Sequence, residues 1–304
     1  MEIQESMEYH NPVLLQESVE GLNIKPNGIY VDVTFGGGGH SREILSRLGD
    51  KGKLFAFDQD EDALANAIDD SRFTLINENF RFIKRFLRFH GVKEVDGILG
   101  DFGVSSHQFD VAERGFSTRF DAKLDMRMSR RGNLSAYDVI NDYDEQQLKK
   151  MFYDYADLRM APKLAAEIVQ ARQESPIESS ERLNEVLRPF LFKEKEHKIL
   201  AQIYQAIRIE VNQEMEVLRE FLKQTEELIK KGGRLSLISY HSLEDRLVKR
   251  YIRSGLFEGE PEKDFYGNIS VPFKKVKGLI VPTAEEVARN KRARSARLRI
   301  AKKL

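Results

Sequence analysis

A chain of 304 residues with 41% hydrophobic and 32% charged side chains has the composition of a globular protein with one large or two moderate domains. The absence of cysteine excludes disulfides, thiolate metal sites and cysteine nucleophiles. The 49 basic and 49 acidic side chains balance, so net charge does not indicate a nucleic-acid partner. Because no apolar run has the length of a membrane span and the charged start lacks a signal peptide, we expect a cytoplasmic protein without membrane contact.

The first hundred residues alternate apolar, β-branched runs with helical patterns. Strands are expected at 28–35, 53–57, 73–76 and 95–99, and helices from Ser41 and at 62–68. Strands separated by helices of this length predict βαβ units and a parallel sheet.

Residues 81–89 interleave aromatic and basic side chains. Such interleaving occurs on surfaces where RNA bases stack. Because Phe82, Phe86 and Phe89 recur at helical spacing, we expect them instead to form the buried face of a helix, with the basic residues outside.

A helical block follows the sheet signals. Helices are expected at 136–141, 144–155, 162–173 and 181–192, with another starting near His197. A long amphipathic helix at 211–231 is predicted to end at Gly232-Gly233, and 234–239 to return as a strand. This arrangement predicts a discontinuous sheet domain, 1–107 with 206–304, and an inserted helical domain at 108–205.

Two features at the expected carboxyl ends of strands indicate a ligand. Four glycines, Gly36 to Gly39, follow the first strand, and Asp58 follows the second. Glycines let a backbone approach a ligand closely, and the helix that follows offers unpaired N–H groups. A carboxylate about twenty residues further on suits two ribose hydroxyls. The pair predicts a nucleoside-containing cofactor at the edge where open α/β sheets bind ligands.

The glycine run itself leaves more than one cofactor open. The dinucleotide pattern G-x-G-x-x-G, counted from Gly36, requires glycine at 41, where Ser41 stands. Asp32 before a glycine-rich turn is typical of S-adenosylmethionine sites, which we favour. A nicotinamide-dependent oxidoreductase on the same kind of sheet is the alternative function. The glycine run could also have a purely structural role, as a tight turn between strand and helix that binds no ligand.

Polar residues also gather near the end of the chain. Tyr240 and His241 follow the last expected strand and are candidate contacts to a base or RNA, whereas Ser242, three residues before Asp245, is expected to cap a helix. Residues 289–304 hold eight Lys or Arg and no carboxylate, which fits either a phosphate backbone or a solvated face. The six histidines show no metal-ligand spacing, so no protein-bound metal is expected.

With these segments in view, the chain resembles the MraW/RsmH family, the cytosine-N4 methyltransferases of small-subunit ribosomal RNA. The matching stretches follow in order along almost the whole chain: 10–15 (HNPVLL), 32–41 (DVTFGGGGHS), 101–106 (DFGVSS), Gln108, 114–117 (RGFS), 124–128 (LDMRM), 205–212 (QAIRIEVN), 239–246 (SYHSLEDR) and 290–299 (NKRARSARLR). The chain departs from the family pattern at His107, where proline is common, and at Ala156-Asp157, where Gly-Glu is usual.

The resemblance implies an α/β fold, the Rossmann-like sheet of S-adenosylmethionine-dependent methyltransferases, with an inserted all-helical domain for substrate recognition. The implied cofactor contacts are Gly38, Gly39, His40, Asp58, Phe80, Asp101 and Gln108. Phe80 also reads as an ordinary core aromatic, and Gln108 as an exposed loop amide. Asp101, at the end of the fourth strand, is the expected catalytic residue. Candidate substrate contacts are Arg127, Tyr240, His241, Arg292 and Arg294.

The implied reaction is N4-methylation of a cytosine in 16S ribosomal RNA within the small subunit, by direct transfer to the exocyclic amine without a covalent enzyme intermediate. The lack of cysteine agrees, because methylation at a pyrimidine ring carbon usually needs a thiolate. The target base has to be unpaired or extruded to reach a pocket. A ribosome assembly factor that holds the cofactor without catalysis is a further alternative, and both a monomer and a homodimer are compatible with the sequence.

Overall fold

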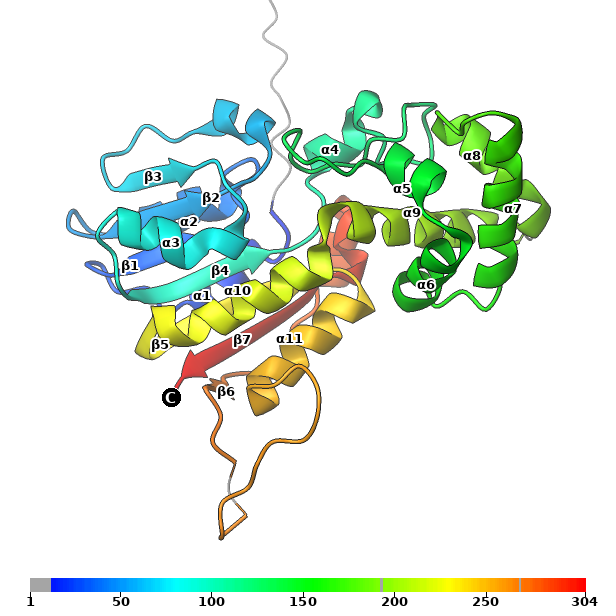
Figure 1. Ribbon diagram of the computed structural model, residues 1–304. Coiled ribbons are helices and arrows are strands. Elements are labelled where there is room, and N and C mark those ends of the chain that lie inside the picture. Colours follow the sequence, from blue (N-terminus) through cyan, green and yellow to red (C-terminus); the bar gives the residue numbers. More distant parts are fainter. Residues whose placement is uncertain (1–11, 192–193, 268) are drawn as a thin grey trace, which may run out of the picture. The chain divides into compact units, whose positions relative to one another are not determined.

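The computed structural model describes residues 12–191, 194–267 and 269–304 (Figure 1). The chain forms two compact units, one made of the chain up to Gly103 together with Glu216–Leu304, and the other of Val104–Met215. The second unit contains the expected insert, 108–205, and extends beyond it. It does so because helix α9 (Glu196–Asn212) continues unbroken past residue 205, so the chain cannot leave the helical core there.

The first unit is built on a seven-stranded sheet with the strand order β3-β2-β1-β4-β5-β7-β6. Strands β1 to β5 are parallel, β7 is antiparallel to β5, and β6 is antiparallel to β7. The strands are β1 (Ile29–Asp32), β2 (Lys53–Phe57), β3 (Phe73–Ile76), β4 (Val95–Asp101), β5 (Ile229–Ser239), β6 (Phe273–Lys275) and β7 (Arg297–Lys303). The expected α/β sheet of Rossmann-like type is confirmed, and β2 and β3 begin and end at the expected residues.

Helices cover both faces of this sheet. On one face α1 and α2 bury Val19 and Ile44 against Tyr30 and Leu54. On the other face, toward the viewer in Figure 1, lie α3 and α10. The Gln224 side chain of α10 accepts the Lys84 N–H of α3 and donates to the Arg81 carbonyl in η2. The helices of this unit are α1 (Leu15–Gly21), α2 (Gly39–Arg47), α3 (Ile83–Phe89), α10 (Glu214–Leu228), α11 (Ser242–Ser254) and α12 (Ala284–Arg289), with 3-10 turns η1 (Glu61–Asn66), η2 (Phe80–Phe82) and η5 (Lys291–Ser295).

The order of the strands creates a switch point beside β1. This strand pairs with β2 on one side and with β4 on the other. The connections that leave β1 and β4 therefore run to opposite sides of the sheet, and a crevice opens between them at the carboxyl edge. The glycine run after β1 and Asp101 at the end of β4 both lie at this edge.

Three expected elements differ in their local backbone. The helix expected at 62–68 is the 3-10 turn η1, which the Asp60 side chain caps. The long helix expected at 211–231 is divided, because Gln213 is left-handed (φ 50°) between α9 and α10. Gly232-Gly233 does not close a helix but lies inside β5, where Gly232 (φ 84°) accommodates a bulge opposite β4.

The expected buried face of α3 is wrong for two of its three phenylalanines. Ile83 and Leu87 are the fully buried positions, one helical turn apart. Since each residue rotates the helix by about 100°, Phe82 and Phe89 then point to solvent. Phe86 is half-buried and meets the Phe57 ring edge-on at 6.4 Å between centroids.

The basic end of the chain is a strand of the sheet. In β7 the sequence Arg297-Leu298-Arg299-Ile300 alternates, and Leu298 and Ile300 are buried while the arginines are not. Residues 297–303 are therefore not a wholly solvated face, and contact of the basic end with a phosphate backbone stays a prediction. The alternation of basic and apolar residues that predicts a strand is short here and lies within a segment rich in Lys and Arg, so the sequence alone does not indicate β7 clearly.

The regular elements of the second unit are helices in its described residues, apart from an isolated bridge between Lys123 and Ser179. Ser135, Asp144 and Ser179 each accept a backbone N–H from the first turn of the helix that follows, which fixes three of the helix starts. The helices are α4 (Ser106–Asp110), α5 (Ala136–Asp142), α6 (Glu145–Ala156), α7 (Ala161–Glu174), α8 (Ser180–Leu187) and α9, with 3-10 turns η3 (Ala112–Arg114) and η4 (Arg188–Phe190).

The helix expected at 181–192 ends earlier than the sequence pattern suggests. It stops as α8 at Leu187, and Pro189 follows within η4. Residue 192 lies outside the described residues. In the part of the chain that the structure covers, no helix is both long and apolar enough to cross a bilayer.

Candidate functional site

The turn between β1 and α2 is tightly packed on one side and open on the other. Gly36 (φ 51°) and Gly38 (φ 77°) adopt left-handed backbone conformations. A Cβ on Gly38 would lie 2.9 Å from the Phe35 ring, and one on Gly39 would lie 2.1 Å from Pro12 Cγ. Among the described residues, no heavy atom beyond the chain neighbours lies within 4 Å of a Cβ built on Gly36 or Gly37. A ligand can therefore approach this backbone closely.

A buried carboxylate, Asp32, lies beneath the turn. It accepts hydrogen bonds from the Ser41 hydroxyl at 2.7 Å and from the Thr34 amide at 3.1 Å. Burial raises the pKa of Asp32, while attraction to His40 and the hydrogen bond from Ser41 oppose that rise. Ser41, the residue that breaks the dinucleotide pattern, thus fastens the start of α2 to the end of β1.

Asp58 lies across the turn at the end of β2. Its Oδ2 accepts the Gly36 N–H at 2.7 Å, and its Oδ1 accepts the Asp60 N–H at 2.9 Å. Burial raises its pKa to about 6, with repulsion from Asp60 and Asp32 adding to the rise and the two backbone hydrogen bonds opposing it. Each carboxylate oxygen keeps further lone-pair capacity, so Asp58 is suited to accept hydroxyl donors from a ligand.

Asp101 ends β4 on the opposite side of the turn. Its backbone N–H donates to Thr34 Oγ1 at 2.6 Å, which ties β4 to the Asp32 cluster. The Tyr240 hydroxyl hydrogen-bonds to its carboxylate, yet Oδ1 is buried without a partner among the described residues. Burial raises the pKa of Asp101 to about 6, while attraction to His40 and the Tyr240 hydrogen bond lower it. An unpartnered buried oxygen of this kind is suited to accept a donor from a substrate.

His40, in the first turn of α2, is buried, and its Nε2 lies 3.2 Å from the Val13 carbonyl oxygen. This contact holds the segment around Pro12 and Val13 against the glycine turn. His40 interacts electrostatically with both Asp32 and Asp101. It therefore links the charges at the end of β1 and at the end of β4.

Phe80 lies in η2, directly after β3, and is half-buried. Its ring centroid is 5.8 Å from that of Phe102, next to Asp101, and 5.2 Å from that of Phe221 on α10. Phe80 therefore belongs to an aromatic cluster at the edge of the crevice and keeps part of its surface exposed. The packing agrees in part with a core aromatic, and the contact of Phe80 with a ligand stays a prediction.

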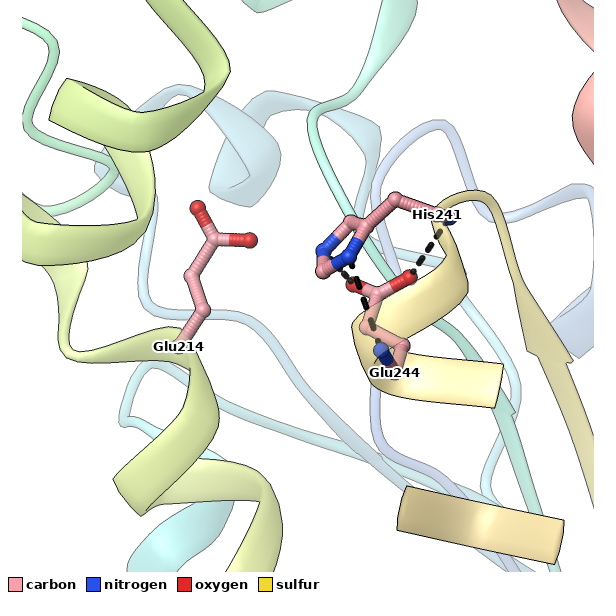
Figure 2. Close-up of side chains that lie close together, drawn as sticks. All are labelled: Glu214, His241 and Glu244. Atoms are coloured by element: carbon pink, nitrogen blue, oxygen red, sulfur yellow. Dashed lines mark hydrogen bonds and ion pairs between the residues drawn. The ribbon is translucent and has the colours of Figure 1, made fainter. Parts of the chain in front are cut away.

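Tyr240 and His241 form the connection between β5 and α11, and both have structural roles. Burial and the nearby Asp101 carboxylate raise the pKa of Tyr240 well above its usual value. His241, not Ser242, is the N-cap of α11: its Nδ1 accepts the Glu244 N–H, and its Nε2 lies 3.1 Å from Glu244 Oε1 (Figure 2). The Glu244 carboxylate in turn accepts the Tyr240 N–H at 2.9 Å. The expectation that Ser242 caps this helix is wrong, because the helix begins one residue earlier than a Ser-x-x-Asp box requires.

Gln108 and Arg127 belong to the second unit. Gln108 is buried and completes a capping box with Ser105 at the start of α4, so the exposed loop amide expected from the sequence is wrong. Arg127 pairs with Asp125 at 2.6 Å and donates to the Gly132 carbonyl at 2.9 Å, which fixes the loop around it. Their roles as cofactor and substrate contacts stay predictions.

The arginines near the end of the chain fall into two groups. Arg297 and Arg299, on β7, pair with the buried Asp245 of α11 at 3.1 and 2.7 Å. Arg292 and Arg294 lie on the short turn η5 and are exposed. Sequence reasoning missed Asp245 as the anchor of β7, although its place one turn into α11 was visible. The hydrogen bond from the Asp101 N–H to the Thr34 hydroxyl was also missed, because the sequence offers no signal for it.

The chain is similar to proteins of a known family along nearly its whole length. The model of the MraW methylase family matches residues 7–304. A ribosomal RNA small subunit methyltransferase H from Christiangramia forsetii is 76% identical, with 98% of this chain and 99% of that protein covered. A protein of the same name from Bacteroides fragilis is 55% identical over 99% of each chain. Among solved structures, an rRNA methylase from Streptococcus thermophilus has a TM-score of 0.41 at 12% identity, with 95% of this chain and 93% of that chain covered.

The capping role of His241 predicts a difference between two substitutions. His241→Ala removes the acceptor for the Glu244 N–H and should lower the free energy of unfolding by about 1 kcal/mol, whereas His241→Asn, which can still cap, should lose only a few tenths. Urea denaturation followed by circular dichroism measures both. Equal losses for Ala and Asn would show that the cap contributes nothing.

Proposed function

This chain belongs to the MraW methylase family, and on that basis we propose that it transfers the methyl group of S-adenosylmethionine to the N4 amine of a cytosine in the 16S RNA of the small ribosomal subunit. The observation that supports this most directly is Asp101, whose buried Oδ1 has no partner among the described residues and which ends β4 at the switch point. The relatives reported above are all named methyltransferases, and none supports an oxidoreductase or a non-catalytic assembly factor.

The residues of the crevice fit the proposed cofactor. The open side of the glycine turn offers backbone to its methionine end, next to Gly38, Gly39 and His40. Asp58 would accept the two ribose hydroxyls, and the exposed part of Phe80 would lie against adenine. When bound, S-adenosylmethionine supplies an electrophilic methyl group on a positively charged sulfur. Gln108 is included in this set from the family resemblance alone.

Asp101 is placed to make the acceptor amine more nucleophilic and to accept its proton. The lone pair of the cytosine N4 is delocalised into the ring, so the amine is a poor nucleophile. An ionised Asp101 that accepts one N–H would localise this lone pair and orient it. Methylation leaves the nitrogen with one proton to lose, and a carboxyl group with a pKa of about 6 can take it near neutral pH. The Tyr240 hydroxyl positions this carboxylate and keeps it ionised.

The substrate contacts proposed from the sequence now divide by their structural roles. Tyr240 acts through Asp101, and His241 caps α11, so both are positioning residues. Arg292 and Arg294, exposed on η5, are the proposed phosphate contacts, with Arg127 of the second unit. The acceptor base has to leave any stacked helix before its amine can reach Asp101.

Nucleoside analysis tests the proposed reaction. Purified protein is incubated with labelled S-adenosylmethionine and small subunits from cells that lack the enzyme, and the RNA is digested. Labelled N4-methylcytidine is expected at about one methyl group per subunit. Label in another nucleoside would refute the acceptor, and no label in RNA would refute the activity.

Substitution of Asp101 tests its role in the same assay. Asp101→Asn keeps the size of the side chain and removes its charge, so kcat should fall roughly 10²-fold or more at saturating cofactor. Tyr240→Phe removes a hydrogen bond that lowers the pKa of Asp101, so the acidic limb of the pH–rate profile should move to higher pH. Asp50→Asn, at an exposed loop, is the control. Full activity of Asp101→Asn would exclude this role.

The raised pKa of Asp58 predicts how the affinity for the cofactor depends on pH. Its ionised form accepts hydroxyls, so the affinity for S-adenosylhomocysteine should be constant above pH 7 and should fall as pH drops through about 6, approaching tenfold per unit. Calorimetric titrations from pH 5 to 8 measure this. Asp58→Asn should bind weakly and lose the dependence, whereas Asp101→Asn should retain it. The same pH dependence in Asp58→Asn would contradict the assignment.

A further inference from the structure

The outward side of α3 carries aromatic and basic side chains that the proposed active site does not use. Phe89 is 83% exposed and Phe82 is 41% exposed, and Arg85 and Arg88 are exposed between them. A single exposed phenylalanine is unremarkable on a protein surface. Two at the ends of one short helix, Phe82 as the N-cap of α3 and Phe89 as its last residue, with arginines between them, form a surface of a kind that binds nucleic acid. We refer to Phe82, Arg85, Arg88 and Phe89 as the α3 stripe.

The charges around the α3 stripe leave it positive. Two carboxylates of the neighbouring helix α10 pair with other cations: Glu220 with Arg81 at 2.6 Å, and Glu227 with Lys84. Within the described part of the chain, Arg85 and Arg88 make no ion pair of their own, and Arg88 reaches Glu227 only as a longer-range attraction. The two guanidinium groups are therefore available for an anionic partner.

The spacing of the α3 stripe suits a polymer of stacked bases. Phe82 and Phe89 are seven residues apart, which is about 10 Å along a helix axis, or roughly three base-stacking intervals. The stripe begins two residues after Phe80, at the carboxyl edge of the sheet, and α3 carries it toward the opposite edge. An RNA segment bound along the stripe would therefore begin beside the aromatic cluster of Phe80, Phe102 and Phe221 at the edge of the crevice.

We propose that the α3 stripe binds an unpaired segment of the RNA substrate, with bases stacked on Phe82 and Phe89 and phosphates held by Arg85 and Arg88. This inference rests on the proposed function, because it takes the partner to be the RNA that carries the methylated base. A second copy of the chain fits less well. A two-fold interface centred on the stripe would bring the unpaired arginines of both copies together.

Binding of a fluorescein-labelled single-stranded oligocytidine to the full chain, followed by anisotropy, tests the stacking. Phe89→Leu keeps an apolar side chain but removes the ring, and should weaken binding about tenfold. Phe89→Tyr keeps the ring and should bind within twofold of the parent. Phe265→Ala is the matched control: Phe265 is 97% exposed but follows Glu262 and Asp264, and its loss should have no effect.

The arginines are tested by the salt dependence of the same binding. Arg85→Ala and Arg88→Ala should each reduce the slope of log affinity against log salt by about 0.7, the value for one phosphate contact on a single strand. Phe89→Leu should lower affinity without changing this slope. Stacking and phosphate contacts therefore give separate signatures.

The result separates this inference from the proposed function. The α3 stripe variants should bind S-adenosylhomocysteine normally and keep kcat at saturating subunits, with a raised KM for the subunit. Oligocytidine binding by Phe89→Leu equal to that of the parent would overturn the inference, even if N4-methylcytidine is formed. Sedimentation that shows a dimer lost in Phe89→Leu, with RNA affinity unchanged, would overturn it in favour of a second copy. Weaker RNA binding by the variants would support it, even if no methyl transfer were found.

Discussion

The hydrogen bonds of the buried Asp32 carboxylate hold the candidate site together. Burying a carboxylate costs several kcal/mol unless donors surround it, and here Ser41 and Thr34 supply them. Through Ser41, Asp32 fixes the first turn of α2 and with it the glycine turn. Through Thr34, whose hydroxyl accepts the Asp101 N–H, it fixes the end of β4. One side chain beneath the crevice therefore sets the distance between the proposed cofactor turn and the proposed catalytic residue.

The electrostatics of the crevice follow from the same arrangement. Asp32 interacts with both Asp58 and Asp101, and burial with mutual repulsion raises the pKa of each. Three carboxylates at one edge of a sheet, of which only Asp32 and Asp101 are attracted to His40, make a site that favours a cation. The sulfonium of the proposed cofactor is such a cation, and its binding would favour the ionised forms of Asp58 and Asp101.

Much of the sheet could be predicted from the sequence, because short β-branched runs with turns at both ends leave little choice of structure. β2 and β3 are the clearest cases. The sequence predicts the wrong local structure where contacts between distant segments decide whether a residue ends a helix, continues a strand or is buried. Gly232 reads as a helix end and is a strand bulge, and Gln213 carries no sign of the left-handed backbone that divides α9 from α10. In α3, the spacing of the phenylalanines predicts the wrong buried face, because Ile83 and Leu87 are the residues that pack against the sheet.

The candidate site was predictable to a similar degree. Asp58 and Asp101 stand out because they end strands, and strand ends of parallel sheets meet at one edge. The partners of these residues were not visible in the same way. Nothing in the sequence links Tyr240 to Asp101, because this pair depends on how β4 and β5, which are far apart in the chain, pack together. That His241 rather than Ser242 caps α11 is decided locally, by a helix start one residue earlier than the Ser-x-x-Asp pattern suggests.

The most direct test of the central claim is a crystal structure of the chain with S-adenosylhomocysteine. We expect the ribose hydroxyls at a hydrogen-bond distance of about 2.7 Å from the Asp58 carboxylate. The amino-acid end of the ligand should lie along the Gly38–Gly39 backbone and its sulfur should face Asp101, with Asp32 out of contact. Ligand density away from the crevice between β1 and β4 would contradict it.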